Sequence, residues 1–198
     1  MRARMLRLSL TAAALAVFAS TAEAGWQDEA SPYDVNRLAK LGEARAKALD
    51  EAQAGADLPT IHAVLDPAPQ PVSADALMGA WRCRTIKLGG LTPDVVYGWF
   101  RCRIMRERGN LFFEKLSGSQ RIRGALYPYE SGGYVLLGAL SVSGEPMHRY
   151  SGNHASAGAI ATPDDAIGLL VGTGAGHARI EFPYPVQEST FDVIELKR

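Results

Sequence analysis

The chain of 198 residues carries 21 basic and 21 acidic side chains, so its formal net charge is zero, and 47 % of its residues are hydrophobic. A near-neutral balance argues against binding to nucleic acid or to a membrane surface through bulk charge. The length suits one domain with its own hydrophobic core, and the 20 glycines and 11 prolines favour a chain with many turns.

The N-terminus has the three parts of a cleavable export signal over residues 1–24. An apolar run over 8–19 is too short to span a bilayer, and residues 22–24 have the A-x-A cleavage pattern. We therefore expect a periplasmic or secreted protein that is not inserted in the membrane once the signal is removed. Removal would leave 18 basic and 20 acidic residues, a net charge of −2. The basic residues before the apolar run are Arg2, Arg4 and Arg7.

The chain has two cysteines, Cys83 and Cys102. Disulfides persist in oxidising compartments, and a structural metal site usually needs four ligands. We therefore predict a disulfide between the two, with two buried free thiols as the alternative. On the chain-entropy view, closing a loop of this size stabilises the fold by roughly 3 kcal/mol.

A helix and a connector are predicted between the signal and the first cysteine. In 25–56, Ser31 is a suitable N-cap and Pro32 suits the first helical position, and a thin apolar stripe at helical spacing follows. We expect a helix from about 32 to 53 that covers one side or end of a larger β domain. Residues 57–78 are rich in proline, which predicts a connector with no more than a short apolar turn over 61–65.

Residues 79–198 change to alternating hydrophobicity, with turn residues about every ten positions. Successive short strands without helices between them predict a mainly β fold, an eight-stranded antiparallel barrel, with a sandwich as the alternative. The strand order within 144–176 is not determined by the pattern. The candidate strands are 81–88, 95–105, 111–116, 120–127, 134–142, 156–162, 178–184 and 191–197.

Four arginines flank the two cysteines and carry the candidate ligand-binding site: Arg82, Arg84, Arg101 and Arg103. If a disulfide joins directly opposite cysteines, Arg82 faces Arg103 and Arg84 faces Arg101 on one sheet surface. Like charges in opposite positions are destabilising, so a compensating anion is expected. The guanidinium groups suit an anionic ligand or an acidic patch of an envelope protein. The alternative is a solvated face balanced by carboxylates of neighbouring strands.

Catalytic and metal-binding signals are weak. The sequence contains no G-x-S-x-G elbow and no H-E-x-x-H pattern, so we expect no metal and no cofactor and assign no catalytic residue. A Ser-His-Asp arrangement converges only in space, which leaves a hydrolase site near His148 and His154 open. The glycines of 172–176 precede a strand pattern, not a helix, so they predict a turn rather than a phosphate loop.

Four sequence blocks carry a family resemblance. In order they are WRCRTIKLG from Trp81, FRCR from Phe100, EKLSGSQR from Glu114 and ESTFDVIEL from Glu188. With these blocks the chain resembles domain of unknown function 4893, a family of exported alphaproteobacterial proteins. The resemblance implies a signal peptide and the paired cysteines, and it brings no activity and no catalytic residues. A G-x-W tripeptide from Gly79 gives a weaker likeness to lipocalin-type small barrels.

These observations together favour a non-catalytic binding or interaction module in the periplasm. The expected partner is an anionic ligand or an envelope protein. An inhibitor of an envelope enzyme is the first alternative, and a hydrolase with an unrecognised site is the second.

Overall fold

The computed structural model describes residues 25–152 and 162–198. The expected signal peptide, most of the strand expected over 156–162, and His154 lie outside the described residues. Within the described part, helices come first and strands follow, as expected from the change in periodicity.

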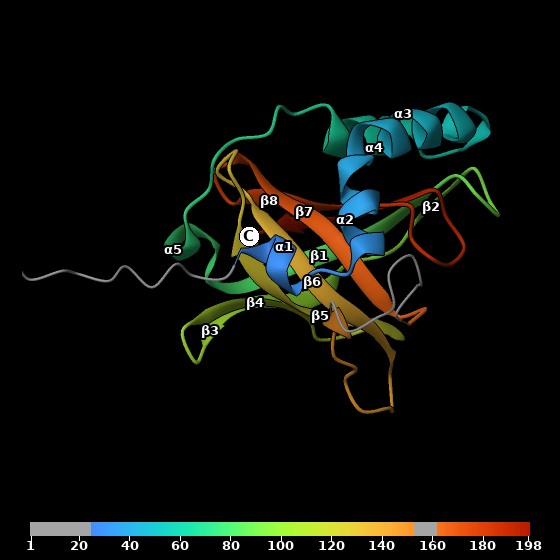
Figure 1. The fold of residues 1–198 in the computed structure, drawn as a ribbon. Helices are drawn as coiled ribbons and strands as arrows, with labels where there is room; N and C mark the ends of the chain where they lie inside the picture. The colour runs from blue at the N-terminus through green and yellow to red at the C-terminus, as the bar shows by residue number, and fades with distance from the viewer. Residues whose placement is uncertain (1–24, 153–161) are drawn as a thin grey trace, which may run out of the picture.

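Eight antiparallel strands form a closed barrel (Figure 1). Each strand pairs with the next, and β9 pairs with β1 to close the sheet. The barrel prediction is thus confirmed over the sandwich. A further short strand, β2 (Asp94–Val96), pairs with the end of β1. The barrel strands are β1 (Gly79–Leu88), β3 (Phe100–Glu107), β4 (Asn110–Lys115), β5 (Gln120–Pro128), β6 (Tyr134–Val142), β7 (Asp165–Gly174), β8 (His177–Pro183) and β9 (Phe191–Lys197).

Apolar side chains fill the interior of the barrel, because alternate residues of each strand point inward. One end is closed by the short helix α5 (Ala74–Leu77), whose Leu77 is fully buried. The indole Nε1 of Trp81 donates a hydrogen bond of 2.7 Å to the Leu77 carbonyl and fixes this end. The opposite end carries polar side chains. The interior set includes Trp81, Cys83, Cys102, Ile104, Phe113, Ile122, Leu136, Leu170, Ile180 and Leu196.

Helices α1 to α4 lie on one side of the barrel, over the sheet from β6 through β9 to β1 (Figure 1). Helix α2 packs on β7, whereas α3 packs on β8, β9 and β1. The single helix expected over 32–53 is therefore wrong, since a break at Lys40 divides it into α2 and α3, which pack on different strands. The helices are α1 (Trp26–Glu29), α2 (Pro32–Ala39), α3 (Leu41–Glu51), the 3-10 turn η1 (Ala52–Ala54) and α4 (Leu58–Leu65).

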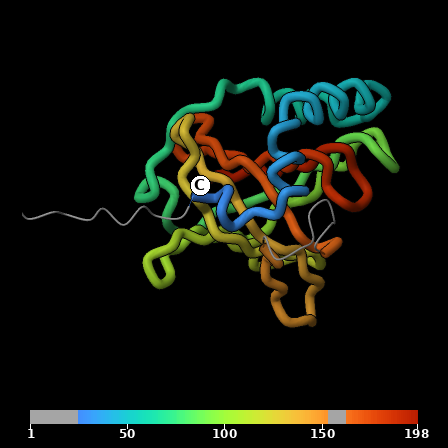
Figure 2. The backbone as a smooth tube through the Cα atoms, viewed as in Figure 1, coloured from blue at the N-terminus to red at the C-terminus, as the bar shows by residue number. Residues whose placement is uncertain are grey.

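The proline-rich connector contains more structure than its composition indicates. Helix α4 buries Ile61, Val64 and Leu65 against the same cluster as α3. Beyond α4 the chain runs to the closed end of the barrel, where it meets α5 (Figure 2). On the way Gln70 forms a bridge with Gly172 of β7 through two backbone hydrogen bonds of 2.8 and 3.1 Å.

A buried ion pair fastens α4 to the barrel wall. Arg179 of β8 is fully buried, and its Nε donates to Glu181 Oε1 at 2.5 Å. Its Nη1 donates to the carbonyls of Val64 and Pro67 at 3.3 and 2.7 Å. Because the guanidinium is balanced by a carboxylate and by carbonyls, Arg179 serves as a structural cation.

The location of β7 is the largest difference from the expected strand pattern. The strand covers Asp165–Gly174, and a strand over 156–162 was predicted instead. Most of β7 is buried on both faces, because the barrel interior covers one face and α1 and α2 cover the other. A strand buried on both faces is apolar without alternation, so it gives no period-two signal. The predicted turn at 172–176 is found at Ala175 and Gly176.

Candidate functional site

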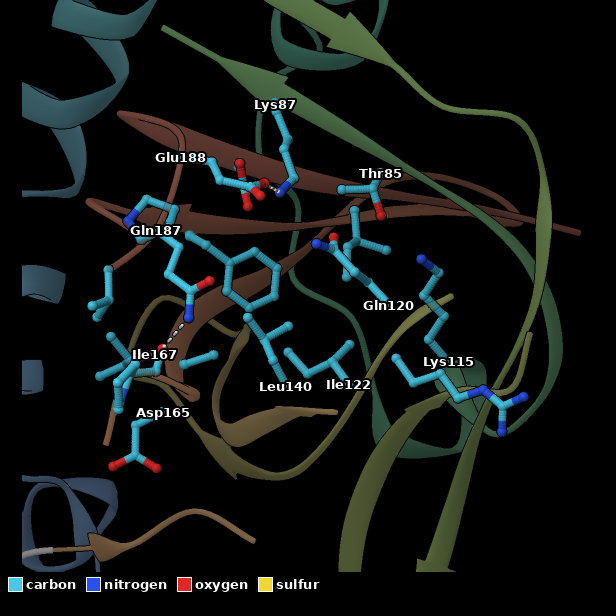
Figure 3. Close-up of a pocket in the computed structure, with 18 of the residues that line it drawn as sticks. Thr85, Lys87, Lys115, Gln120, Ile122, Leu140, Asp165, Ile167, Gln187 and Glu188 are labelled. Carbon is cyan, nitrogen blue, oxygen red and sulfur yellow. Dashed lines mark hydrogen bonds and ion pairs between the residues drawn. The ribbon is translucent and has the colours of Figure 1, made fainter. Parts of the chain in front are cut away.

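A small cavity occupies the polar end of the barrel, opposite α5 (Figure 3). Its volume is about 70 Å³. The walls come from β1, β4 to β9 and the loop 184–190, and they combine apolar side chains with a few charged ones. The apolar side includes Ile122, Leu140, Ile167, Phe182 and Ile194, and the polar side includes Thr85, Lys87, Lys115, Gln120, Glu188 and Asp192.

Lys115 is the most unusual residue of this cavity. It is the last residue of β4 and points inward after Leu111 and Phe113, so that only 6 % of it is exposed. Its Nζ lies 4.3 Å from the centre of the Phe100 ring. Within residues 25–152 and 162–198, no carboxylate forms an ion pair with it. Burial, and secondarily the charge of Lys87, lowers the pKa of Lys115 to about 8.

A pKa of about 8 leaves Lys115 mostly protonated at neutral pH. The cavity therefore holds a buried ammonium group with an aromatic ring as its partner and no counter-ion from the described part of the chain. Burying a charge without a counter-ion is costly, so such a group is rarely kept for stability.

Lys87 has the opposite environment, although it lies in the same cavity. It faces Asp192 across β1 and β9, and its Nζ forms an ion pair with Glu188 (Figure 3). Burial alone would lower the pKa of Lys87, but the hydrogen bond to Glu188 and the charge of Asp192 outweigh burial and raise it. Lys87 is thus neutralised by the protein itself.

Asp192 is a partly buried acid of the cavity. Burial raises its pKa to about 6, against the hydrogen bond from Ser189 and the charge of Lys87, which lower it. The Ser189 hydroxyl donates to Asp192 Oδ1 at 2.5 Å. The cavity consequently contains one acid that titrates near pH 6 and one base that titrates near pH 8.

The loop 184–190 forms the outer wall of the cavity. Pro185, Val186 and Gln187 line it, and the Gln187 side chain donates to the Pro163 carbonyl at 3.5 Å (Figure 3). Arg37 of α2 supports the base of this loop, because it donates to the carbonyls of Tyr184 and Asp165, both at 3.1 Å. Its guanidinium also pairs with Asp34, so it is not available to a ligand.

The two cysteines form a disulfide, as predicted, and both sulfur-bearing side chains are buried in the barrel interior. The predicted register is nevertheless wrong by two residues. Cys83 lies opposite Phe100, and Cys102 lies opposite Trp81, so the bridge joins diagonal neighbours with a Cα–Cα distance of 5.9 Å. A disulfide accommodates this spacing as readily as a direct pair, which is why the bridge does not determine the register.

The four predicted arginines lie together on the outer wall, away from the barrel interior. Arg82 faces Arg101, and Arg103 faces Ala80. Two of the four are balanced by carboxylates of neighbouring strands. Arg84 pairs with Glu195 of β9, and Arg103 pairs with Glu114 of β4 at 2.8 Å.

The histidines do not form a metal site in the described part of the chain, where no group of three or more suitable ligands occurs. His148 Nδ1 lies 3.0 Å from Asp164 Oδ2, and both side chains are exposed. His154, the second residue of the hydrolase alternative, is outside the described residues.

The comparison with family models gives one match, to domain of unknown function 4893, and it spans residues 26–196. The chain belongs to this family. The match covers the helices and the whole barrel of the DUF4893 domain, so both Lys115 and the four arginines lie inside it. No curated protein and no solved structure matches the chain. Among the helices of 25–152 and 162–198, none is long and apolar enough to cross a membrane.

Sequence reasoning missed the cavity of the DUF4893 domain, although a signal was present. Lys87 follows Trp81 and Cys83 at even spacing, and Lys115 follows Phe113 in the same way. Each lysine therefore stands at an inward position, where the alternating pattern of the strand calls for an apolar side chain. Such exceptions indicate the polar end of a barrel.

Proposed function

We propose that this domain is a non-catalytic binding module that works outside the cytoplasm and holds a small anionic ligand at the polar end of its barrel. Lys115 carries the proposal. A ligand carboxylate placed against its ammonium group would supply the counter-ion that the described chain does not provide.

The cavity wall favours an anion with an apolar portion. Ile122, Leu140 and Phe182 face the same space as Lys115, so a hydrocarbon group would be removed from water there. A volume of about 70 Å³ offers room for about five water-sized groups. A short-chain carboxylate matches both properties.

The neighbouring charges also favour an anion. The positive charge of Lys87 is already balanced by Glu188 and Asp192, so Lys87 does not compete with Lys115 for the ligand. Of the lining cations, Lys115 and Arg121 form no ion pair with a described residue, and an incoming carboxylate meets Lys115 as the buried one of these two. A cationic ligand would meet the same ammonium group as a like charge.

Work outside the cytoplasm is supported by the disulfide between Cys83 and Cys102, because such bonds persist in oxidising compartments. The export signal expected over 1–24 agrees with it.

The test is a titration of the domain with acetate, butyrate and hexanoate, followed by NMR chemical shifts of the cavity residues. We expect saturable binding that strengthens from acetate to butyrate, is lost in Lys115→Met, and weakens as the pH rises through about 8. Lys40→Met is the matched control, because Lys40 is exposed at the junction of α2 and α3. Equal binding by the wild type and Lys115→Met would contradict the proposal.

A further inference from the structure

A second charged feature lies on the outer wall of the barrel and does not involve the cavity. Three cations stand side by side on neighbouring strands, in register: Arg101 of β3, Arg82 of β1 and Lys197 of β9. His177 of β8 continues the line, because it faces Lys197. We call Arg101, Arg82 and Lys197 the cationic row.

Trp99 organises this surface. The Lys197 ammonium lies 4.0 Å from the centre of the indole, and the guanidinium carbons of Arg84 and Arg82 lie 4.8 and 5.2 Å from it. Each cation–π contact at an exposed site is weakly attractive, and three such contacts converge on this ring. The indole therefore holds cations of two adjacent strands close together, where their mutual repulsion would otherwise separate them.

The charge of the row is not balanced within the part of the chain that the structure describes. Glu195 neutralises Arg84 and Glu114 neutralises Arg103, but no ion pair involves a member of the row. Like charges directly opposite in a sheet are destabilising. Both contacts of the row, Arg101 with Arg82 and Arg82 with Lys197, are of this kind.

We infer that the cationic row binds an acidic segment of a partner protein in an extended conformation. The strands of a sheet lie about 4.8 Å apart, so the row runs about 10 Å across the wall. An extended peptide presents every second side chain on the same side, at intervals of roughly 6.6 Å. Carboxylates at alternate positions therefore fall within reach of the long arginine and lysine side chains.

The shape of the wall favours a chain over a bilayer. The row follows the circumference of the barrel, which curves, whereas a membrane surface is flat and would meet only part of it. The Trp99 ring is engaged by three cations. An interfacial tryptophan would need its ring for the lipid headgroup region.

The test uses the purified domain and a synthetic peptide with glutamate at alternate positions, and the same peptide with glutamine as its control. Binding is measured by fluorescence anisotropy at low and at physiological salt. The test variant is Arg82→Gln/Arg101→Gln. The matched control is Lys40→Gln/Arg108→Gln, which removes two exposed cations elsewhere.

We expect the wild type to bind the glutamate peptide and not the glutamine peptide, with an affinity that falls as salt increases. The Arg82→Gln/Arg101→Gln variant should lose about tenfold or more in affinity, and the control variant should keep wild-type affinity. Trp99 fluorescence should change on binding only where the row is intact. Thermal unfolding of the test variant should occur within a few degrees of the wild-type temperature, because the loss of the Arg82–Trp99 contact offsets the removal of a repulsive pair.

Equal peptide affinity in the test and control variants would overturn the inference. Binding to phosphatidylglycerol vesicles but not to the peptide would also overturn it, in favour of a membrane surface. A fall of the unfolding temperature by more than about 4 °C, beyond what the lost cation–π contact would cause, would identify the arginines as structural and count against the inference. Carboxylate binding in the cavity should be unchanged in Arg82→Gln/Arg101→Gln, so this result is separate from the test of the proposed function.

Discussion

Lys115→Met replaces a buried ammonium group by an apolar side chain of similar length, and we expect it to stabilise the fold while it abolishes anion binding. The pKa of Lys115 falls from an ordinary value of 10.5 to about 8. At about 1.4 kcal/mol per pKa unit, the charged side chain makes the folded state about 3 kcal/mol less stable at neutral pH. Removing it should raise Tm by roughly 6–12 °C for a domain of this size.

The stability gained in Lys115→Met should depend on pH, in a direction that follows from the direction of the pKa shift. The pKa is lower in the folded state than in the unfolded chain, so the unfolded chain binds the proton more tightly. The destabilisation by the charged Lys115 side chain is complete below pH 8 and disappears as the pH rises from about 8 towards 10.5. The advantage of Lys115→Met should therefore be largest at pH 7 and roughly halved at pH 9.5.

The measurement is thermal unfolding of both proteins, followed by circular dichroism at pH 7 and pH 9.5 with the disulfide intact. Arg179→Met serves as the contrasting variant, because that cation is equally buried but is paired with Glu181. Arg45 Nη1 remains 3.8 Å from Glu181 Oε2, so the loss of Arg179 should cost up to about 3–5 kcal/mol. If Lys115→Met lowers Tm at pH 7, the side chain has a structural partner and our reasoning about the cavity is refuted.

Two further predictions concern the cavity acid and the disulfide. The pKa of Asp192 rises from 3.8 to about 6, so its negative charge destabilises the fold above pH 6, and this effect vanishes below pH 3.8. In Asp192→Asn, the free energy of unfolding should therefore rise by up to about 3 kcal/mol at pH 8 and stay unchanged at pH 3.5. A lower free energy of unfolding at pH 8, measured by urea unfolding, would contradict this prediction. In Cys83→Ala/Cys102→Ala, the free energy of unfolding should fall by about 3 kcal/mol relative to the oxidised wild type. An unchanged free energy of unfolding would show that the disulfide restrains little of the unfolded chain.

Much of the barrel could be predicted because most of its strands have one face in the interior and one towards solvent. In β1 the inward Trp81 and Cys83 alternate with the outward Arg82 and Arg84, and this period of two is visible in the sequence. Strand β7 could not be found in this way, since helices cover its outer face and its outward side chains are therefore mostly apolar. The break at Lys40 separates two helices that pack on different strands, and these tertiary contacts are not visible in the local apolar pattern.

The candidate site was predictable only in part, for a geometric reason. Because side chains alternate between the two faces of a strand, the spacing of the four arginines in β1 and β3 places them all on the outer wall. The partners of Arg84 and Arg103, however, come from β9 and β4, so they depend on strand order. Lys115 and Asp192 are far apart in sequence and line the same cavity only because the sheet closes on itself. The burial that shifts both pKa values depends on that closure.

The plug at one end of the barrel determines how any solute can exchange. Leu77 and Trp81 seal the interior there, and the Arg198 side chain donates to the Leu77 carbonyl at 3.1 Å across the same end. Because apolar side chains fill the interior between this end and the cavity, a solute does not pass through the barrel from the Leu77 end. The loop 184–190 lines the cavity at the other end, so changes to this loop should alter the rates of ligand association and dissociation.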